Sequence, residues 1–136
     1  MDKKKLVFFF LLVISFILVG CSIENDNSVS PPTVEEIITK NPDADIFMFR
    51  GVIYEANIDW IDELTLIKGE KIGEITEQAV DDHYKYKDGM ANKLSVGAII
   101  YEVEESSARE NNTYGNGVVI VDDHGEQKYY MANMEG

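Results

Sequence analysis

The sequence predicts an α+β domain that is mainly β: a small curled antiparallel sheet or partly open barrel with one or two short helices, placed after an N-terminal signal segment. Two observations carry this prediction. Short apolar runs of β-prone residues recur along the chain, and most of them are separated by turns that contain glycine. Helical periodicity is confined to two short stretches. Many short strands joined by tight turns favour a curled sheet or a barrel.

The chain divides into three parts. Residues 1–20 are predicted to be a signal peptide, residues 21–32 a lipidated cysteine with a flexible linker, and residues 33–136 a single small acidic β-rich domain. The linker is polar and without periodicity, and it is expected to stiffen at its end, Pro31-Pro32. The remaining stretch of roughly 100 residues is long enough for one hydrophobic core.

The N-terminus has the pattern of a secretory signal. Residues 1–5 include three lysines, and residues 6–19 are apolar except for Ser15. The apolar run is shorter than the roughly 20 residues that a stable membrane span needs. Gly20 and Cys21 follow it. Cys21 is the only cysteine of the chain, so no intramolecular disulfide is expected.

Residues 18–21, Leu-Val-Gly-Cys, resemble the lipobox of bacterial lipoproteins. The resemblance implies that the Cys21 thiol receives a diacylglyceryl group and that a signal peptidase cuts between Gly20 and Cys21. The mature chain then begins at a lipidated cysteine on the extracytoplasmic face of the cell membrane. Two acyl chains anchor stably, because each buried methylene contributes about 0.8 kcal/mol. The alternative is a free cysteine beside an uncleaved anchor.

A second resemblance covers about half of the chain. Residues 45–54, Trp60, and residues 68–75 and 88–102 are similar to small uncharacterised lipoproteins of Gram-positive bacteria. Those relatives often have Asn-Gly where this chain has Arg50-Gly51, and Leu-Pro-Val-Gly where it has residues 94–97. The resemblance implies the same location and a compact β-rich domain, and it brings no assigned activity.

The charge balance narrows the choice of partners. Residues 1–20 hold three of the 12 basic and one of the 25 acidic residues, so the mature chain keeps nine and 24, a formal net charge of −15. Nucleic acid is excluded as a partner, because phosphate binding depends on Lys and Arg. We expect a basic envelope protein, a wall polymer, or a contact bridged by divalent cations. Alternatively, the acidity only keeps the domain soluble.

Two short helices are predicted. Thr33 and Glu36 have the spacing of a capping box, which starts a helix over residues 34–40 that Asn41-Pro42 ends. Residues 57–64 place Trp60, Ile61 and Leu64 on one side of one or two helical turns.

The rest of the domain is predicted as strands and turns. In chain order these are a hairpin of residues 46–49 and 52–54 around Arg50-Gly51, strands 64–67 and 71–75 around a turn at 68–70, a half-exposed strand at 84–87, a turn at Asp88-Gly89, the longest strand at 96–103, a polar loop at 104–112, and a last hairpin of 118–121 and 127–131 around 122–125. The expected core consists of Phe47, Phe49, Ile53, Tyr54, Trp60, Ile99, Ile100, Tyr101, Val119 and Val121.

One repeated triplet offers metal ligands. The sequence Asp-Asp-His occurs twice, as Asp81, Asp82 and His83 and as Asp122, Asp123 and His124. If the two stretches met in space, their imidazoles and carboxylates could bind Zn²⁺, and their oxygens alone could bind Ca²⁺. Asp-Asp-His followed by Gly125 is also typical of a hairpin loop with glycine in the left-handed region.

Other candidate chemistry is weaker. Tyr84 and Tyr86 could form, with Trp60, an aromatic platform for a sugar ring, although aromatics that alternate along a strand more often face a core. The sequence contains no distinctive carboxylate pair, serine-nucleophile motif or phosphate-binding loop. We therefore expect that the protein is not an enzyme and binds no cofactor. The sequence therefore predicts a non-catalytic binding or interaction domain, with a divalent-metal module as the alternative.

Overall fold

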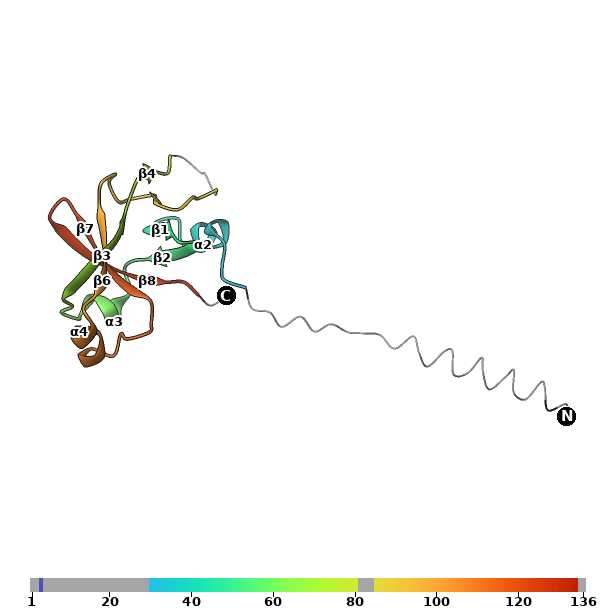
Figure 1. Cartoon of the computed structure of the whole chain (residues 1–136). Helices are drawn as coiled ribbons and strands as arrows, with labels where there is room; N and C mark the ends of the chain where they lie inside the picture. The colour runs from blue at the N-terminus through green and yellow to red at the C-terminus, as the bar shows by residue number, and fades with distance from the viewer. Residues whose placement is uncertain (1–2, 4–29, 81–84, 135–136) are drawn as a thin grey trace.

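The structure, a computed structural model, describes residue 3, residues 30–80 and residues 85–134. The signal peptide, the cleavage after Gly20 and the lipidation of Cys21 lie outside the described residues and stay predictions. Within the described part, eight strands form one sheet in the order β3-β6-β7-β8-β2-β1-β5-β4, and the sheet curls into a half-barrel (Figure 1). The predicted mainly β fold with a curled, partly open barrel is therefore confirmed.

Three short helices accompany the strands in this part of the chain. The elements are α2 (Val34–Lys40), β1 (Ile46–Phe49), β2 (Val52–Glu55), α3 (Asp59–Asp62), β3 (Lys68–Glu74), β4 (Glu77–Gln78), β5 (Met90–Ala91), β6 (Ile99–Val103), α4 (Glu105–Glu110), β7 (Val118–Asp123) and β8 (Glu126–Ala132). Neighbouring strands are antiparallel except for β4 and β5, which pair in parallel.

Local sequence signals account for α2 and for the two hairpins. The Thr33 side chain accepts a hydrogen bond from the Glu36 N–H, and the Glu36 carboxylate accepts one from the Thr33 N–H, which completes the predicted capping box. At the first hairpin, Arg50 and Gly51 both have positive φ, 51° and 75°. Two positive φ values in a two-residue loop match the twist of a hairpin. His124 and Gly125 repeat the pattern in the last hairpin.

The inside of the half-barrel holds the main core. Phe47 is fully buried there, with its ring stacked on Tyr54 and edge-on to Tyr130, each at 5.0 Å between centroids. Ring pairs of these geometries add to the burial of apolar area. The buried members of this cluster are Phe47, Ala56, Ile75, Ala91, Leu94, Ala98, Ile100, Val119, Val121 and Tyr130.

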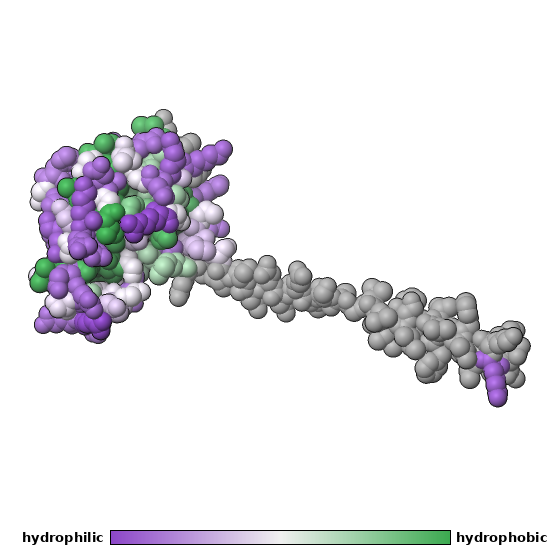
Figure 2. Space-filling view, viewed as in Figure 1, coloured by the Kyte–Doolittle hydropathy of each residue, from purple (hydrophilic) through white to green (hydrophobic). Residues whose placement is uncertain are grey.

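The outer face of the sheet is also covered with apolar side chains, in two places. Under α2, one cluster joins Val34 and Ile37 to Ile46 and Ile53 of the first hairpin. Under α3, another joins Ile61 and Leu66 to Val118 and Ile120. Hydrophilic residues cover much of the remaining visible surface (Figure 2). Every member of the three clusters lies within residues 34–131, so this part of the chain contains its own core.

One charged group is buried at the edge of the main core. Asp45 is 3 % exposed, accepts a hydrogen bond of 2.8 Å from the Tyr130 hydroxyl and pairs with the Lys128 ammonium. Burial, with Asp45 as a second cause, raises the pKa of Tyr130 far above its usual value. The tyrosine therefore remains a neutral donor that satisfies the buried carboxylate.

Three predictions about strands are wrong. Residues 64–67 are not a strand, and the predicted turn at residues 68–70 is the beginning of β3. Gly69 is placed there because a Cβ would lie 3.1 Å from the Glu102 backbone oxygen, so this glycine allows a close approach of β3 to β6. Residues 85–87 are not a strand either; Tyr86 packs instead against the cluster under α2.

Three further details differ from the prediction. The strand predicted at 96–103 begins only at Ile99, because Val96 and Gly97 form a turn in which Gly97 has φ 95°. The polar loop predicted at 104–112 contains α4, whose N-terminal N–H groups at Ser106 and Ser107 donate to the Glu104 carboxylate. The last hairpin turns over two residues, since Asp122 and Asp123 belong to β7.

The predicted core is mostly right. Phe47, Ile53, Ile100, Val119 and Val121 are buried. Half-buried members are Phe49, Tyr54, Ile99 and Tyr101. Trp60 is wrong, because it is 46 % exposed on α3 while its neighbour Ile61 is buried.

Candidate functional site

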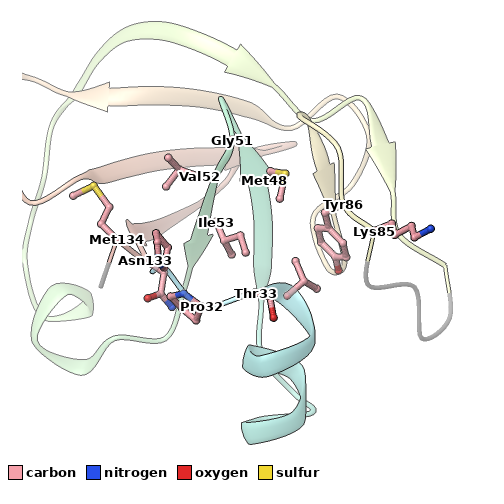
Figure 3. Close-up of a pocket in the computed structure, with 12 residues that line it drawn as sticks. Pro32, Thr33, Met48, Gly51, Val52, Ile53, Lys85, Tyr86, Asn133 and Met134 are labelled. Carbon is pink, nitrogen blue, oxygen red and sulfur yellow. The ribbon is translucent and has the colours of Figure 1, made fainter. Parts of the chain in front are cut away.

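A cleft of about 490 Å³ lies beside the start of α2, over the outer face of the β1–β2 hairpin (Figure 3). Four segments that are distant in sequence form its walls: the end of the predicted linker, the hairpin, the segment after residue 84 and the last described residues. The lining residues are Pro31, Pro32, Thr33, Val34, Met48, Gly51, Val52, Ile53, Lys85, Tyr86, Asn133 and Met134.

The floor of the cleft follows from strand geometry. Successive side chains of a strand point to opposite faces, so Phe47 enters the half-barrel while Met48 faces outward. Met48 lies directly opposite Ile53 in the hairpin register, and both line the cleft. The hairpin is therefore apolar on both faces, one closed by the main core and the other partly covered by α2.

The end of the hairpin is fixed at the rim of the cleft. The Gly51 N–H donates a hydrogen bond of 2.9 Å to Oδ1 of Asp88, which belongs to the predicted turn Asp88-Gly89. Gly89 donates its own N–H to the Met48 carbonyl oxygen at 2.8 Å. These contacts hold the residues after position 84 against the hairpin, so the wall that contains Tyr86 is anchored at Asp88 and Gly89.

Two backbone carbonyls of the cleft floor already have partners. The Met48 carbonyl accepts from Gly89, and the Ile53 carbonyl accepts a 2.7 Å hydrogen bond from the Asn133 N–H. Phe49 and Val52 pair with each other across the hairpin. A bound molecule would therefore meet side chains, with little unpaired backbone to satisfy.

Polar groups are few and lie mainly at the rim. Lys85 is the one charged residue among the described lining residues; it is exposed, and in Figure 3 its ammonium group points away from the cleft floor. Burial raises the pKa of the Tyr86 hydroxyl, so this group stays neutral at physiological pH. The Asn133 side chain donates to Glu55 at 3.2 Å, outside the cleft.

The volume and apolar lining of this cleft fall within the range of small-molecule sites. Small-molecule sites are concave, mostly apolar and about 300–1,000 Å³ in volume, with a few polar groups that orient the ligand. The cleft has that size and that lining. Its two methionines are flexible side chains that fit irregular apolar ligands.

The predicted metal ligands are only partly described. Asp81, Asp82 and His83 lie outside the described residues. Four strands of the sheet separate β7, which carries Asp122 and Asp123, from β4, the strand that precedes residue 81. Within the described residues, no group of three or more His, Cys, Asp or Glu side chains is placed to hold a metal ion. The joint site of both triplets stays a prediction.

In the second triplet, Asp122, Asp123 and His124, the two carboxylates have different hydrogen-bond partners. Asp122 accepts hydrogen bonds from Lys68 (3.0 Å) and from the Gly125 N–H (2.7 Å), and these lower its pKa. Asp123 Oδ2 accepts from the Ser95 N–H and hydroxyl. Its Oδ1 is buried without a described hydrogen-bond partner, 3.8 Å from His124 Nε2.

The aromatic platform is not assembled in the described residues. Trp60 lies on α3, and Tyr86 packs beside α2 on the other side of the domain (Figure 1). Tyr84, the third member, lies outside the described residues. Tyr86 instead lines the cleft, which the sequence reading did not predict.

A signal for the cleft was present in the sequence. Residues 46–49 are apolar without alternation, and a strand of that kind is covered on both faces. That something packs on the outer face of this strand could therefore have been inferred from residues 46–49. The residues that line the cleft there could not be inferred, because they come from four segments up to about a hundred residues apart.

Comparison with known proteins gives no matching family, no matching curated protein and no matching solved structure. Among the described residues, no helix is long and apolar enough to cross a membrane.

Proposed function

We propose that this protein is a membrane-anchored extracytoplasmic lipoprotein, and that its β-rich domain is a non-catalytic binding domain whose site is the cleft beside α2. The observation that carries the binding role is the cleft itself, an apolar hollow of about 490 Å³ in which the carbonyls of Met48 and Ile53 are already hydrogen-bonded. Binding there needs shape and apolar contact, and no reactive group has to be supplied.

The position of the cleft fits a tethered protein. Pro31 and Pro32, at the end of the predicted linker, line it. An extended stretch from Cys21 to residue 30 spans at most about 35 Å, so the cleft opens within that distance of the proposed anchor. The net charge of −15 in the mature chain keeps the domain off an anionic membrane surface. The membrane partner is thus the lipid on Cys21, while a basic envelope protein or a wall polymer suits the acidic surface.

Binding is tested with a neutral apolar dye, Nile red, on a soluble fragment of residues 22–136. We expect a rise in fluorescence that Met134→Asp weakens, because the new carboxylate lies in the cleft. Ile67→Asp is the matched control, since Ile67 is 58 % exposed and Met134 54 %, and Ile67 does not line the cleft. Equal dye binding by both variants contradicts the cleft as the site.

The anchor is tested separately in cells that express the full chain. We expect Cys21→Ala to abolish labelling by a fatty-acid analogue and to leave an uncleaved precursor. Ser22→Ala is the control and should be labelled and processed normally. Labelling of the Cys21→Ala protein contradicts the lipoprotein proposal and leaves the binding role untouched.

One observation favours the metal-binding alternative. The buried Oδ1 of Asp123 lacks a described partner, and His124 Nε2 lies 3.8 Å from it and 3.3 Å from the Val96 carbonyl oxygen. An imidazole nitrogen, a carboxylate oxygen and a carbonyl oxygen could share one cation.

This alternative is tested by thermal unfolding of the same fragment with chelator and then with Zn²⁺ or Ca²⁺. A ligand at 100 times its dissociation constant stabilises the folded state by about 2.7 kcal/mol. The alternative predicts a rise in Tm that is lost in His124→Ala. No rise with either ion eliminates it.

A further inference from the structure

The cleft has a polarity that points to one class of ligand. We propose that it binds a single-chain anionic amphiphile, a long-chain alkyl carboxylate, with the hydrocarbon chain along the floor and the carboxylate at the rim beside Lys85. This inference rests on the proposed binding role of the cleft and adds the chemistry of the ligand.

The backbone contacts of the floor favour a hydrocarbon chain over a peptide. An extended peptide that binds beside a strand relies on free N–H and C=O groups of that strand. Here the carbonyls of Met48 and Ile53 are taken by Gly89 and Asn133, and the inner edges of β1 and β2 pair with each other. A peptide would bury its own polar groups unpaired, which is unfavourable, while an alkyl chain brings none.

The charges around the cleft favour an anionic head group. Lys85 is the one charged residue among the described lining residues, in a chain of net charge −13. Among the described residues, Lys85 is in no ion pair, as is also true of Lys40 and Lys93, whereas Lys68, Lys71, Lys87 and Lys128 each pair with an acid. Two acids lie close to the cleft: Asp88 accepts a hydrogen bond from the Gly51 N–H at the rim, and Glu55 accepts one from the Asn133 side chain. An anionic head group is therefore attracted to Lys85 and has to lie away from both carboxylates.

The side chains at the rim suit such a head group. Lys85 is exposed, so a carboxylate beside it stays hydrated, and its flexible stem allows the ammonium to follow the ligand. Tyr86, next to it, contributes a half-buried ring above the floor. The source is a free amphiphile, because an acidic domain is repelled by the anionic bilayer surface from which a phospholipid would have to be drawn.

The experiment is isothermal titration of the residue 22–136 fragment at low ionic strength, with ligands below their micelle concentration. The probes are octanoate, decanoate and dodecanoate, together with dodecyltrimethylammonium as the cation of equal chain length. We expect affinity to rise with chain length, by up to about four-fold for each methylene that is fully buried. Dodecanoate should bind more tightly than dodecyltrimethylammonium.

Two variants of equal charge change test the head group. Lys85→Glu should reduce the affinity for dodecanoate by about five-fold, the upper range for an exposed ion pair. The same variant should bind dodecyltrimethylammonium more tightly than wild type does. Lys93→Glu is the matched control, because Lys93 is exposed and does not line the cleft. Equal affinity for both head groups, or equal effects of the two variants, overturns this inference.

The outcomes separate the inference from the proposed function. If Nile red binds in the cleft and no alkyl carboxylate does, the ligand class is wrong and the binding role stands. If neither binds, both are wrong. Vesicles with and without anionic phospholipid test the source: binding of wild type to the anionic vesicles that is lost in Lys85→Glu would show that the cleft takes a membrane lipid, and would overturn the assignment to a free amphiphile.

Discussion

The two faces of the β1–β2 hairpin differ in how completely they are covered. On the inner face, Phe47 is fully buried between Tyr54 and Tyr130. On the outer face, Met48 is half-buried, and α2 leaves a cleft of about 490 Å³ beside it. The same alternation of side chains thus produces a closed core on one side and an open apolar cleft, the proposed binding surface, on the other. The comparison indicates that residues one position apart have different roles, and this can be tested by substituting them in pairs.

The largest expected effect is on the inner face. Phe47→Ala should reduce the free energy of unfolding by about 3–5 kcal/mol, because it removes a fully buried ring and leaves a cavity. Met48→Ala should cost clearly less, since the side chain is half-exposed beside an existing hollow. Urea denaturation of the residue 22–136 fragment measures both. Equal losses would mean that the two faces are equally packed.

The buried carboxylate beside the inner face comes next. Asp45→Asn should cost about 1.5–3 kcal/mol, the range for hydrogen bonds to a charged group, because Tyr130 and Lys128 lose an anionic partner. Asp43→Asn is the control, since Asp43 is exposed and the chemical change is the same. A loss in the control as large as in Asp45→Asn contradicts a special role for the buried group.

High pH should lower the free energy of unfolding of the domain, chiefly through Tyr130 on the inner face. The raised pKa of Tyr130 means that, above about pH 10, the unfolded chain loses this proton while the folded chain keeps it. Stability is therefore full below pH 10 and falls above it, by up to about 1.4 kcal/mol per pH unit from this group. Tyr54 and Tyr86, raised chiefly by burial, act in the same direction.

Equilibrium unfolding between pH 8 and pH 11 measures this loss. Tyr130→Phe should show a shallower decline than wild type, and Tyr114→Phe, at an exposed position, should keep the wild-type slope. A steep decline that persists in Tyr130→Phe shows that other groups cause it.

The smallest effect concerns the wall of the cleft. Thr33→Ala removes the capping box of α2 and should cost about 1 kcal/mol. Amide hydrogen exchange should speed up in α2 and remain unchanged at Val119 and Val121 in the inner core. Thr65→Ala, in the exposed loop after α3, is the control. Faster exchange throughout the domain would show that α2 and the core open together.

Local signals in the sequence account for the parts of the fold that were predicted correctly. Thr33 and Glu36 define α2 by direct contacts three residues apart, and Gly51 and Gly125 define the hairpins by their positive φ. Elements that depend on distant contacts were missed. Gly69 was interpreted as a turn residue, but it lies in β3, where the absence of a side chain lets β3 lie close to β6. The helix α4 was not predicted, because its sequence is polar and shows no apolar periodicity.

The difference between local motifs and distant contacts also explains which parts of the candidate site could be predicted. Cys21 and Gly20 were predicted from a local motif, and the described residues leave that prediction open. His124 and Gly125 form a turn, as the alternative interpretation held, whereas Asp122 and Asp123 belong to β7. The cleft could not be predicted in full, because its lining residues come together only when the hairpin, α2 and the last strand are packed.

The central claim is that the cleft beside α2 is the binding surface of this domain. Its most direct test is NMR: two-dimensional ¹H–¹⁵N spectra of the residue 22–136 fragment during titration with dodecanoate. The account predicts that amide shifts change at Val34, Ile53, Tyr86 and Asn133, and not around His124. Shift changes centred on the His124 turn, or none at saturating ligand, would contradict it.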